Sequence, residues 1–295
     1  MTTIAFLACE TTLPGSAQRR ADAFEHDLMV GALEPALSAR GIELKVIDWE
    51  ADIADFAGVS LALLGSSWNY QDKHADFLAR LDALESQGIT LCNPSDVVRW
   101  NSRKTYLREL AERGAPTIPT MWRETVTYKG ALEALDAFET DRIVVKRQIG
   151  AGAEGQVLIA RSSLPGPEWS FGHPAMLQPY LPAIAEDGEL SLIFIDGAFS
   201  HALRKRAAEG EYRIQSIYGG REEDYAPTSD EIAQAQAVID ALPFDAPLYA
   251  RIDMLRDGEQ LLLMEAEMIE PYLYPEQGPQ FGDTIAAAIA KRLQI

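Results

Sequence analysis

Short apolar runs alternate with amphipathic segments over the first third of the chain. Four runs have the length of buried strands: TIAFLAC (3–9), LKVIDW (44–49), VSLALLG (59–65) and ITLCN (89–93). Two segments repeat apolar residues at helical spacing and stop near a glycine: 18–40, before Gly41, and 74–86, before Gly88. Strands that alternate with helices predict a small parallel sheet, and Pro35 predicts a break or kink in the first helix.

The pattern changes after residue 94. A first block predicts these elements: a helix over 96–114, a helix near 130–139, and strands over 142–148 and 156–161 around the glycine-rich stretch GAGAEG (150–155). A second block predicts two hairpins: ELSLIFI with AFSHALRKR, joined at Asp196–Gly197, and LYARIDML with QLLLMEAEMI, joined at RDG (256–258). Between them, Thr228 and Glu231 form a capping-box pattern for a helix that stops at Pro243.

Three carboxylates, Glu265, Glu267 and Glu270, lie in or next to a run that otherwise has the pattern of a buried strand. Because strand residues alternate between faces, Glu265 and Glu267 share one face, as Arg251 and Asp253 do on the partner strand. An odd-membered turn would place Arg251 opposite Glu265 and bring Asp253 onto the same surface as both glutamates. Three carboxylates without His or Cys favour Mg²⁺ over zinc. The alternative is a structural salt bridge between Arg251 and Glu265.

Composition narrows the classes of partner. The chain has 295 residues, 47% of them hydrophobic, which is enough for two or three domains or subdomains around one cleft. Its 26 basic against 45 acidic residues give a net charge of −19, which repels nucleic acid and anionic lipid, so we expect neither as a partner. No run reaches about 18 apolar residues, and the two cysteines lie in short apolar runs, so a cytoplasmic protein without disulfides is expected.

A lysine next to a glycine-rich loop points to phosphate binding. Lys146 closes the apolar strand and leads into the loop 150–155, whose backbone N–H groups can cover phosphates. A glycine-rich turn alone is weak evidence, because most such turns are structural. Lys104 upstream, the basic run 204–206 with Arg213, and the carboxylates downstream strengthen the case. Phosphate-binding cations combined with a magnesium-type site predict ATP chemistry.

The chain also resembles the ATP-grasp ligases of the glutathione synthetase type. The matching stretches, in order, are NPSDVVRWNSRKTYL (93–107), GAPTIPT (114–120), VVKRQIGAGAEGQ (144–156), LQPYLPAIAEDGELSLIFIDG (177–197), HALRKRAAEGEYRIQSIYGG (201–220), RIDML (251–255) and LLLMEAEMIEP (261–271). A narrower resemblance, through SSWNY (66–70), the WN-x-x-K-x-YL pattern and the E-x-E-x-x-EP ending, is to the branch of cycloserine synthetases, which are O-ureido-serine cyclo-ligases.

The resemblance implies an α/β fold: a small parallel-sheet domain followed by a two-lobed, α+β ATP-grasp part. The units would be a Rossmann-like substrate-side domain, 1–94, a first ATP-grasp lobe, 95–178, and a second lobe with the metal site, 179–295. The implied roles are phosphate contacts by Lys104, Lys146 and the loop with Gly152; adenine contacts by Gln178, Tyr180 and Leu181; ribose near Glu189; Mg²⁺ ligands Asp253, Glu265 and Glu267; and charge neutralisation by Lys205, Arg213 and Arg251.

The implied activity is an ATP-dependent carboxylate–nitrogen ligase that forms an acyl phosphate on a small amino-acid-like substrate. Its cofactors would be ATP and Mg²⁺, with Mn²⁺ as a substitute, and dimers are frequent in the family. Ring closure within one molecule is one form of this chemistry. Two alternatives stay open: a peptide-modifying ATP-grasp ligase, and a non-catalytic ATP-binding regulator. In the cycloserine branch we expect an arginine and an aspartate where this chain has Gly65 and Asn69, so its acceptor pocket should differ.

Overall fold

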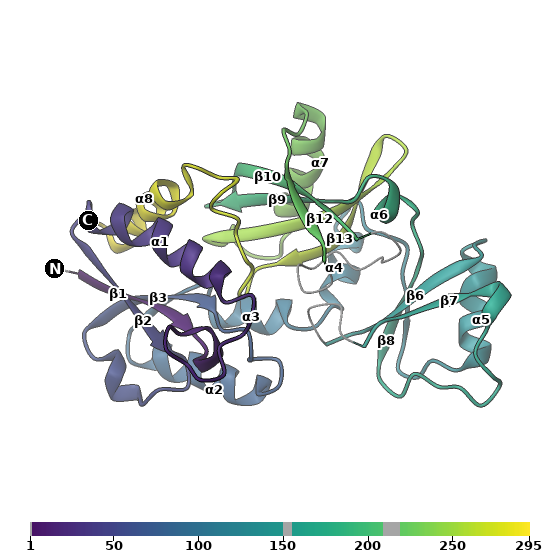
Figure 1. The fold of residues 1–295 in the computed structure, drawn as a ribbon, viewed down its shortest axis with the longest axis horizontal. Coiled ribbons are helices and arrows are strands. Elements are labelled where there is room, and N and C mark those ends of the chain that lie inside the picture. The colour runs from purple at the N-terminus through teal and green to yellow at the C-terminus, as the bar shows by residue number, and fades with distance from the viewer. Residues whose placement is uncertain (1, 150–154, 209–218) are drawn as a thin grey trace.

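Three β-sheets follow one another along the chain. The structure, a computed structural model, describes residues 2–149, 155–208 and 219–295 (Figure 1). The first sheet is parallel, with order β2-β1-β3-β4, and its strands are β1 (Thr2–Ala8), β2 (Ile42–Asp48), β3 (Val59–Ser66) and β4 (Thr90–Cys92). The predicted parallel sheet is therefore confirmed, because its strands alternate with the helices α1 (Phe24–Ser38) and α2 (His74–Ser86). Two short 3-10 turns, η1 (Glu10–Thr12) and η2 (Ile53–Phe56), complete this part.

Helix α1 runs without a break through Pro35, so the predicted break is wrong. The proline lies in the last turn of the helix and removes only the hydrogen bond to the carbonyl oxygen of Gly31, which the helix tolerates three residues before its end at Ser38. The helix also begins at Phe24, later than expected.

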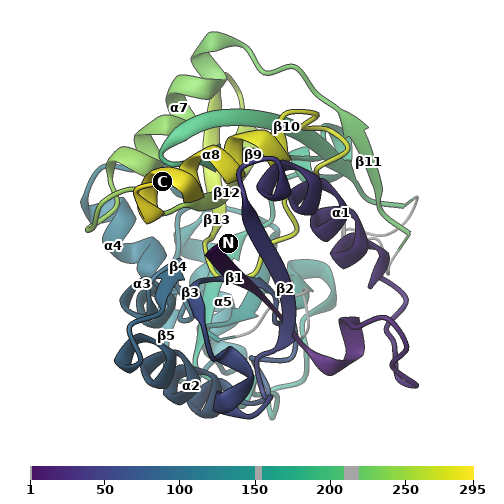
Figure 2. The ribbon, with the colours of Figure 1, turned by 90° about the vertical axis from the view of Figure 1, so that its left-hand side faces the viewer.

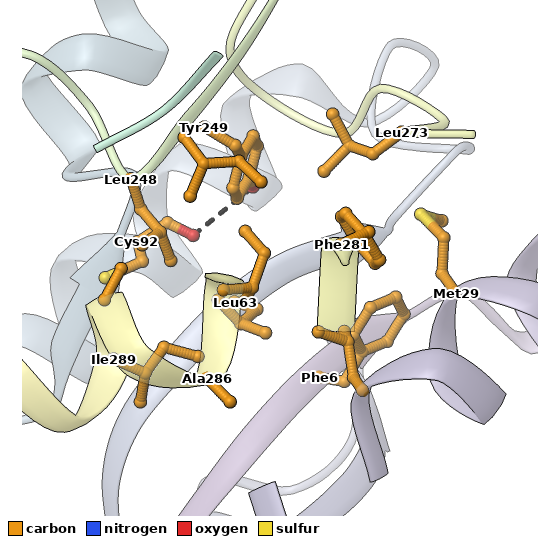
Figure 3. Close-up of a cluster of buried hydrophobic side chains, with 14 of the residues drawn as sticks. Phe6, Met29, Leu63, Cys92, Leu248, Tyr249, Leu273, Phe281, Ala286 and Ile289 are labelled. Atoms are coloured by element: carbon orange, nitrogen blue, oxygen red, sulfur yellow. Dashed lines mark hydrogen bonds between the residues drawn. The ribbon is translucent and has the colours of Figure 1, made fainter. Parts of the chain in front are cut away.

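A helix at the far end of the chain, α8 (Phe281–Leu293), packs against α1, although the sequence had given no prediction for it (Figure 2). Phe281 and Ile289 of α8 join Phe6, Met29 and Leu63 in one apolar core (Figure 3). The C-terminal segment therefore closes one face of the N-terminal sheet.

Gly282 allows the close approach of α8 to α1. A Cβ at this position would lie 2.1 Å from the carbonyl oxygen of Ala32. We expect Gly282→Ala to lower the free energy of unfolding by about 1–3 kcal/mol, because the two helices would have to separate. The matched control is Gly31→Ala within α1, where a Cβ meets nothing within 4 Å. The higher helix propensity of alanine should raise the free energy of unfolding of this variant by about 0.5–1 kcal/mol. Urea denaturation measures both changes, and equal effects would contradict this packing.

The second sheet forms a separate lobe at one end of the molecule (Figure 1). It is antiparallel with order β5-β8-β6-β7, from strands β5 (Met121–Arg123), β6 (Arg142–Arg147), β7 (Val157–Ala160) and β8 (Ala175–Pro179). Helix α5 (Tyr128–Ala137) packs its buried face against it, and the 3-10 turn η3 (Arg161–Ser163) follows β7. The first block of predicted strands is confirmed here.

The helix predicted over 96–114 is two helices, α3 (Ser95–Asn101) and α4 (Tyr106–Glu112). Lys104 lies in the turn between them, and its backbone N–H donates to the carbonyl oxygen of Gln148 at 2.7 Å. The lysine is thus attached to the end of β6 instead of lying along a helix surface.

The third sheet is antiparallel with order β11-β10-β9-β12-β13. Its strands are β9 (Glu189–Ile195), β10 (Ala198–Arg206), β11 (Arg221–Asp224), β12 (Tyr249–Asp257) and β13 (Gln260–Glu267); α6 (Ala183–Glu186) precedes them and α7 (Ser229–Asp240) covers one face. Both predicted hairpins and the capping box of Thr228 and Glu231 are confirmed.

The predicted register of the last hairpin is wrong, although the predicted shared face is found. The turn has two residues, because Asp257 pairs with Gln260. From there to the pair of Met254 with Leu263, partners run in simple order. A β-bulge then adds one residue, Met264, to β13, so Asp253 pairs with Glu265 instead of Leu263.

The bulge decides which face the acids occupy. Without it, Glu265 would lie opposite Ile252 and point away from Asp253. With it, Arg251 pairs with Glu267 and Asp253 with Glu265, so all four side chains share one face of the sheet. Within the described ranges, no helix is both long and apolar enough to cross a bilayer.

Candidate active site

Arg251 is the centre of a buried ion-pair network on the shared sheet face. Its Nη2 donates to Asp253 Oδ2 at 2.9 Å and to Glu267 Oε1 at 2.5 Å, and its Nη1 donates to the carbonyl oxygen of Tyr272 at 3.2 Å. The residue is 8% exposed. Burial raises the pKa of Glu267 to about 7, against the lowering effect of Arg251. One arginine thus binds two carboxylates, of which Asp253 is buried and Glu267 is partly exposed.

Lys205 reaches the same network from β10. Its Nζ lies 3.0 Å from Glu189 Oε1 and 3.5 Å from Asp253 Oδ1. Burial and Arg251 act to lower the pKa of Lys205, but Asp253 and Glu189 outweigh them, and the pKa is raised. Burial opposes ionisation of Asp253 too, yet Arg251 and Lys205 hold its pKa at about 2. The ammonium and the aspartate therefore stay charged in a dry environment.

The two predicted phosphate lysines approach the last hairpin from the other lobe. Lys104 forms an ion pair with Glu265 of β13. Lys146, at the end of β6, lies near both: burial lowers its pKa to about 8, with Glu265 opposing that shift and Lys104 adding to it. The ion pair of Lys104 with Glu265 is therefore a contact between lobes that are far apart in the sequence, and Lys146 interacts electrostatically with both residues. The alternative pair of Arg251 with Glu265 is wrong, because Glu265 binds Lys104.

The three expected metal ligands lie on one face of the sheet, yet each forms an ion pair with a lysine or arginine side chain. Among the residues that the structure describes, no group of three or more His, Cys, Asp or Glu is arranged to hold a metal ion. The donor chemistry nevertheless fits Mg²⁺, because Asp253, Glu265 and Glu267 supply only carboxylate oxygens. Glu189 Oε2 is in addition buried without a hydrogen-bond partner. The metal role of the three acids stays a prediction.

The expected adenine segment borders an apolar cluster. Tyr180 and Leu181 pack against a small core: Ile118, Ile184, Leu255 and Leu262. Gln178 is 2% exposed, and its Nε2 donates to Thr120 Oγ1 at 3.0 Å. Arg142 lies over the ring of Tyr180 at 4.1 Å. A flat apolar wall beside buried polar groups is the usual lining of a nucleotide-base site. The remaining predicted residues, Gly152 and Arg213, lie outside the described residues.

Side chains of α3 and α4 bind the outer edge of β13, and the sequence analysis did not predict these contacts. Asn101 binds the backbone on either side of Glu267: its Nδ2 donates to Ala266 O at 2.8 Å, and its Oδ1 accepts from Met268 N at 2.9 Å. The hydroxyl of Tyr106 accepts from Ala266 N at 2.9 Å. Paired edge groups fix the strand that carries Glu265 and Glu267. Only the WN-x-x-K-x-YL pattern hinted at these residues.

Tyr274 is a second residue that the sequence analysis missed. Its ring lies 5.4 Å from Lys205 Nζ and 5.8 Å from the Arg251 guanidinium carbon. The aromatic face therefore supports both cations. His201, four residues before Lys205 on the same strand, has a structural role, because its Nε2 donates to Leu273 O at 2.9 Å and burial lowers its pKa.

Comparison with known proteins agrees with this arrangement. Residues 4–93 match the family model described as the N-terminal domain of D-cycloserine synthetase DcsG. Over 276 residues the chain is 31% identical to the cycloserine biosynthesis protein DcsG of Streptomyces lavendulae, an alignment that covers 86% of this chain and 90% of that protein.

Solved structures agree over the full length. The crystal structure of D-cycloserine synthetase DcsG superposes with a TM-score of 0.80 at 26% identity, covering 99% of both chains. A structure of the ATP-grasp ligase PsnB complexed with a minimal precursor has a TM-score of 0.67 at 16% identity, covering 99% of this chain and 100% of that one, and supports the fold alone. The expected fold class and the narrower resemblance are confirmed.

Proposed function

Because the chain belongs to the family of the D-cycloserine synthetase DcsG, a family of ATP-grasp ligases, we propose that it joins a carboxylate to a nitrogen of the same small, amino-acid-like molecule. ATP supplies the energy for this ligation. Ring closure is proposed because the relative is a cycloserine biosynthesis protein and cycloserine is a cyclic molecule.

One observation carries the proposal beyond the family. Lys104 pairs with Glu265 of the last hairpin, and Lys146 interacts electrostatically with the same acid. Two lysines that face a strand of carboxylates can hold the phosphates of ATP against the acceptor site. Lys104 pairs with Glu265 in this structure. When ATP binds, its phosphates would compete with this acid for the lysines.

Burial explains how the chain's own residues would act during transfer. Lys205 and Arg251 are 6% and 8% exposed, so their charges act in a region with little water. They would steady the negative charge on the phosphoryl group as it passes to the substrate carboxylate. The acyl phosphate then forms out of contact with bulk water, which limits its hydrolysis.

We infer Mg²⁺ as the metal, held by Asp253, Glu265 and Glu267. When bound, it would supply charge neutralisation to the phosphate oxygens. The cations that pair with these acids can turn to the phosphates and the substrate carboxylate, which would free the carboxylate oxygens as ligands.

The acceptor pocket should differ from that of the cycloserine branch. Position 65 leaves no room for the expected arginine, because a Cβ on Gly65 would lie 2.3 Å from Leu7 O. Asn69, in place of the expected aspartate, accepts from Trp49 Nε1 at 2.6 Å and donates to Glu50 Oε2 at 2.9 Å. We therefore expect a substrate with a different group beside the ring-forming atoms.

A substrate screen tests the proposal. The chain is incubated with Mg-ATP and a panel of O-ureidoserine, D-alanine, L-serine and glycerate, and ADP release and product mass are measured. We expect ADP release that depends on one nitrogen-bearing acid and a product built from one substrate molecule. A product from two molecules would contradict ring closure, and tight ATP binding without ADP release on any acid would favour the regulatory alternative.

A requirement for a ribosomally made peptide would instead favour the peptide-modifying alternative. The homodimer, the cytoplasmic location, the absence of a nucleic-acid partner and the domain boundaries at 94 and 178 stay predictions.

A further inference from the structure

Glu270 differs from the other two glutamates of the final strand run. Glu265 pairs with Lys104 and Glu267 with Arg251. For Glu270, the described parts of the chain offer no Lys, Arg or His within ion-pair distance. Phosphate and metal chemistry therefore account for two of the three acids and leave the third without a role.

The N-terminal domain holds Glu270 in place. The segment after β3 supplies two donors: Trp68 Nε1 donates to the carbonyl oxygen of Glu270 at 2.9 Å, and Gln71 Nε2 donates to its Oε1 at 3.4 Å. The guanidinium of Arg20 lies over the ring of Trp68 at 5.0 Å. Open parallel sheets bind ligands beyond the carboxyl ends of their strands, which is where this segment begins.

Glu270 also lies beside the proposed phosphoryl site. The backbone that follows it reaches Arg251, whose Nη1 donates to Tyr272 O at 3.2 Å. The groups that face the carboxyl electrostatically are Glu267 and Arg251 at the site, and Tyr70 and Tyr249 beneath it. The residue thus stands between the substrate-side domain and the cations of the third sheet.

The carboxyl group of Glu270 is poorly satisfied for a half-buried acid. Burial is the main cause that raises its pKa to about 8, with Glu267 adding to the shift. Its partners within the described residues are its own backbone amide and the long bond from Gln71. A half-buried carboxyl group that accepts so few hydrogen bonds is stabilised by a further N–H donor.

We propose that Glu270 binds the attacking nitrogen of the substrate and accepts the proton that this nitrogen loses. The inference rests on the proposed function. The nitrogen lone pair forms the C–N bond to the acyl carbon, the C–O bond to phosphate breaks, and phosphate leaves. The proton moves from the nitrogen to a carboxylate oxygen of Glu270. Trp68 and Gln71 are positioning residues that fix this acceptor.

The test separates activation of the carboxylate from attack by the nitrogen. Wild type, Glu270→Gln and the exposed control Glu276→Gln are given Mg-ATP and the panel acid that wild type turns over, with and without hydroxylamine. Hydroxylamine attacks the acyl phosphate from solution, so hydroxamate reports the first step alone, and mass spectrometry reports the ring product. We expect Glu270→Gln to lose ring product on the order of 10²-fold, while hydroxamate stays within about threefold of wild type.

Two results would overturn the inference: an equal fall of both products, which indicates a structural role, or no fall in either. Wild type without turnover on the whole panel would count against the proposed function instead. In that case calorimetry in the presence of ADP identifies which panel acid binds wild type. Equal Kd values of that acid for wild type and Glu270→Gln exclude a nitrogen contact at this residue.

Discussion

Replacing Arg251 with methionine is expected to cause the largest loss in this protein. The side chain donates to both Asp253 and Glu267, so its removal leaves the buried carboxylate of Asp253 and the partly exposed one of Glu267 without this cation. Breaking a buried ion pair in this way costs about 3–5 kcal/mol of stability. Loss of a charge that steadies the transferring phosphoryl group should lower kcat by on the order of 10²–10³-fold.

The control for this change is Arg161→Met. Arg161 pairs with Asp136 at 2.8 Å, but the two side chains are 39% and 70% exposed, and such surface pairs contribute about 0–1 kcal/mol. Urea denaturation and ADP release are measured for both variants. A loss of activity in Arg251→Met with unchanged stability would contradict the buried network, and equal behaviour of the two variants would remove Arg251 from the site.

Glu265→Gln should abolish turnover while the fold is kept. Glutamine has the same shape but lacks the charge that pairs with Lys104 and that would bind Mg²⁺. We expect ADP release to fall by on the order of 10²–10³-fold, with little change in the urea midpoint, because the Glu265 side chain is 28% exposed. Mn²⁺ binding, followed by electron paramagnetic resonance with a non-hydrolysable ATP analogue, should weaken in parallel.

The same hairpin provides a matched control in Glu259→Gln, which lies exposed at the turn. That variant should keep wild-type ADP release and Mn²⁺ binding. If Glu265→Gln binds Mn²⁺ as tightly as the control does, the metal assignment of this acid is wrong even where activity falls.

Local pattern was sufficient for most strands and for the kinds of residue at the site. The alternation of apolar runs and helices over 1–94 predicted the parallel sheet, because each helix must bury its apolar face against the strands that it connects. The hairpin at Asp196–Gly197 followed from two residues that tolerate positive φ, which are 50° and 80° here. The order of lysines, glycines and acids along the chain was sufficient to predict ATP chemistry.

Pattern failed where the outcome depended on distant partners. The helix over 96–114 has no proline or glycine before Gly114, yet it breaks at Lys104, whose amide binds Gln148. The packing of helix α8 against α1 depends on the close approach of Gly282 to Ala32, which only the folded structure shows. Both results depend on contacts more than 40 residues away in the sequence, which no local signal contains.

The amino-acid sequence by itself determined that carboxylates would lie in a buried strand of the last hairpin and that lysines would come from an earlier lobe. Tertiary structure alone decided that they meet. The run Leu261–Leu263 is buried throughout and carries no alternation, so nothing local fixed which face Glu265 would take. The single extra residue of the bulge, Met264, settled it by shifting the register of β13 by one residue, which turned Glu265 toward Asp253 and Lys104.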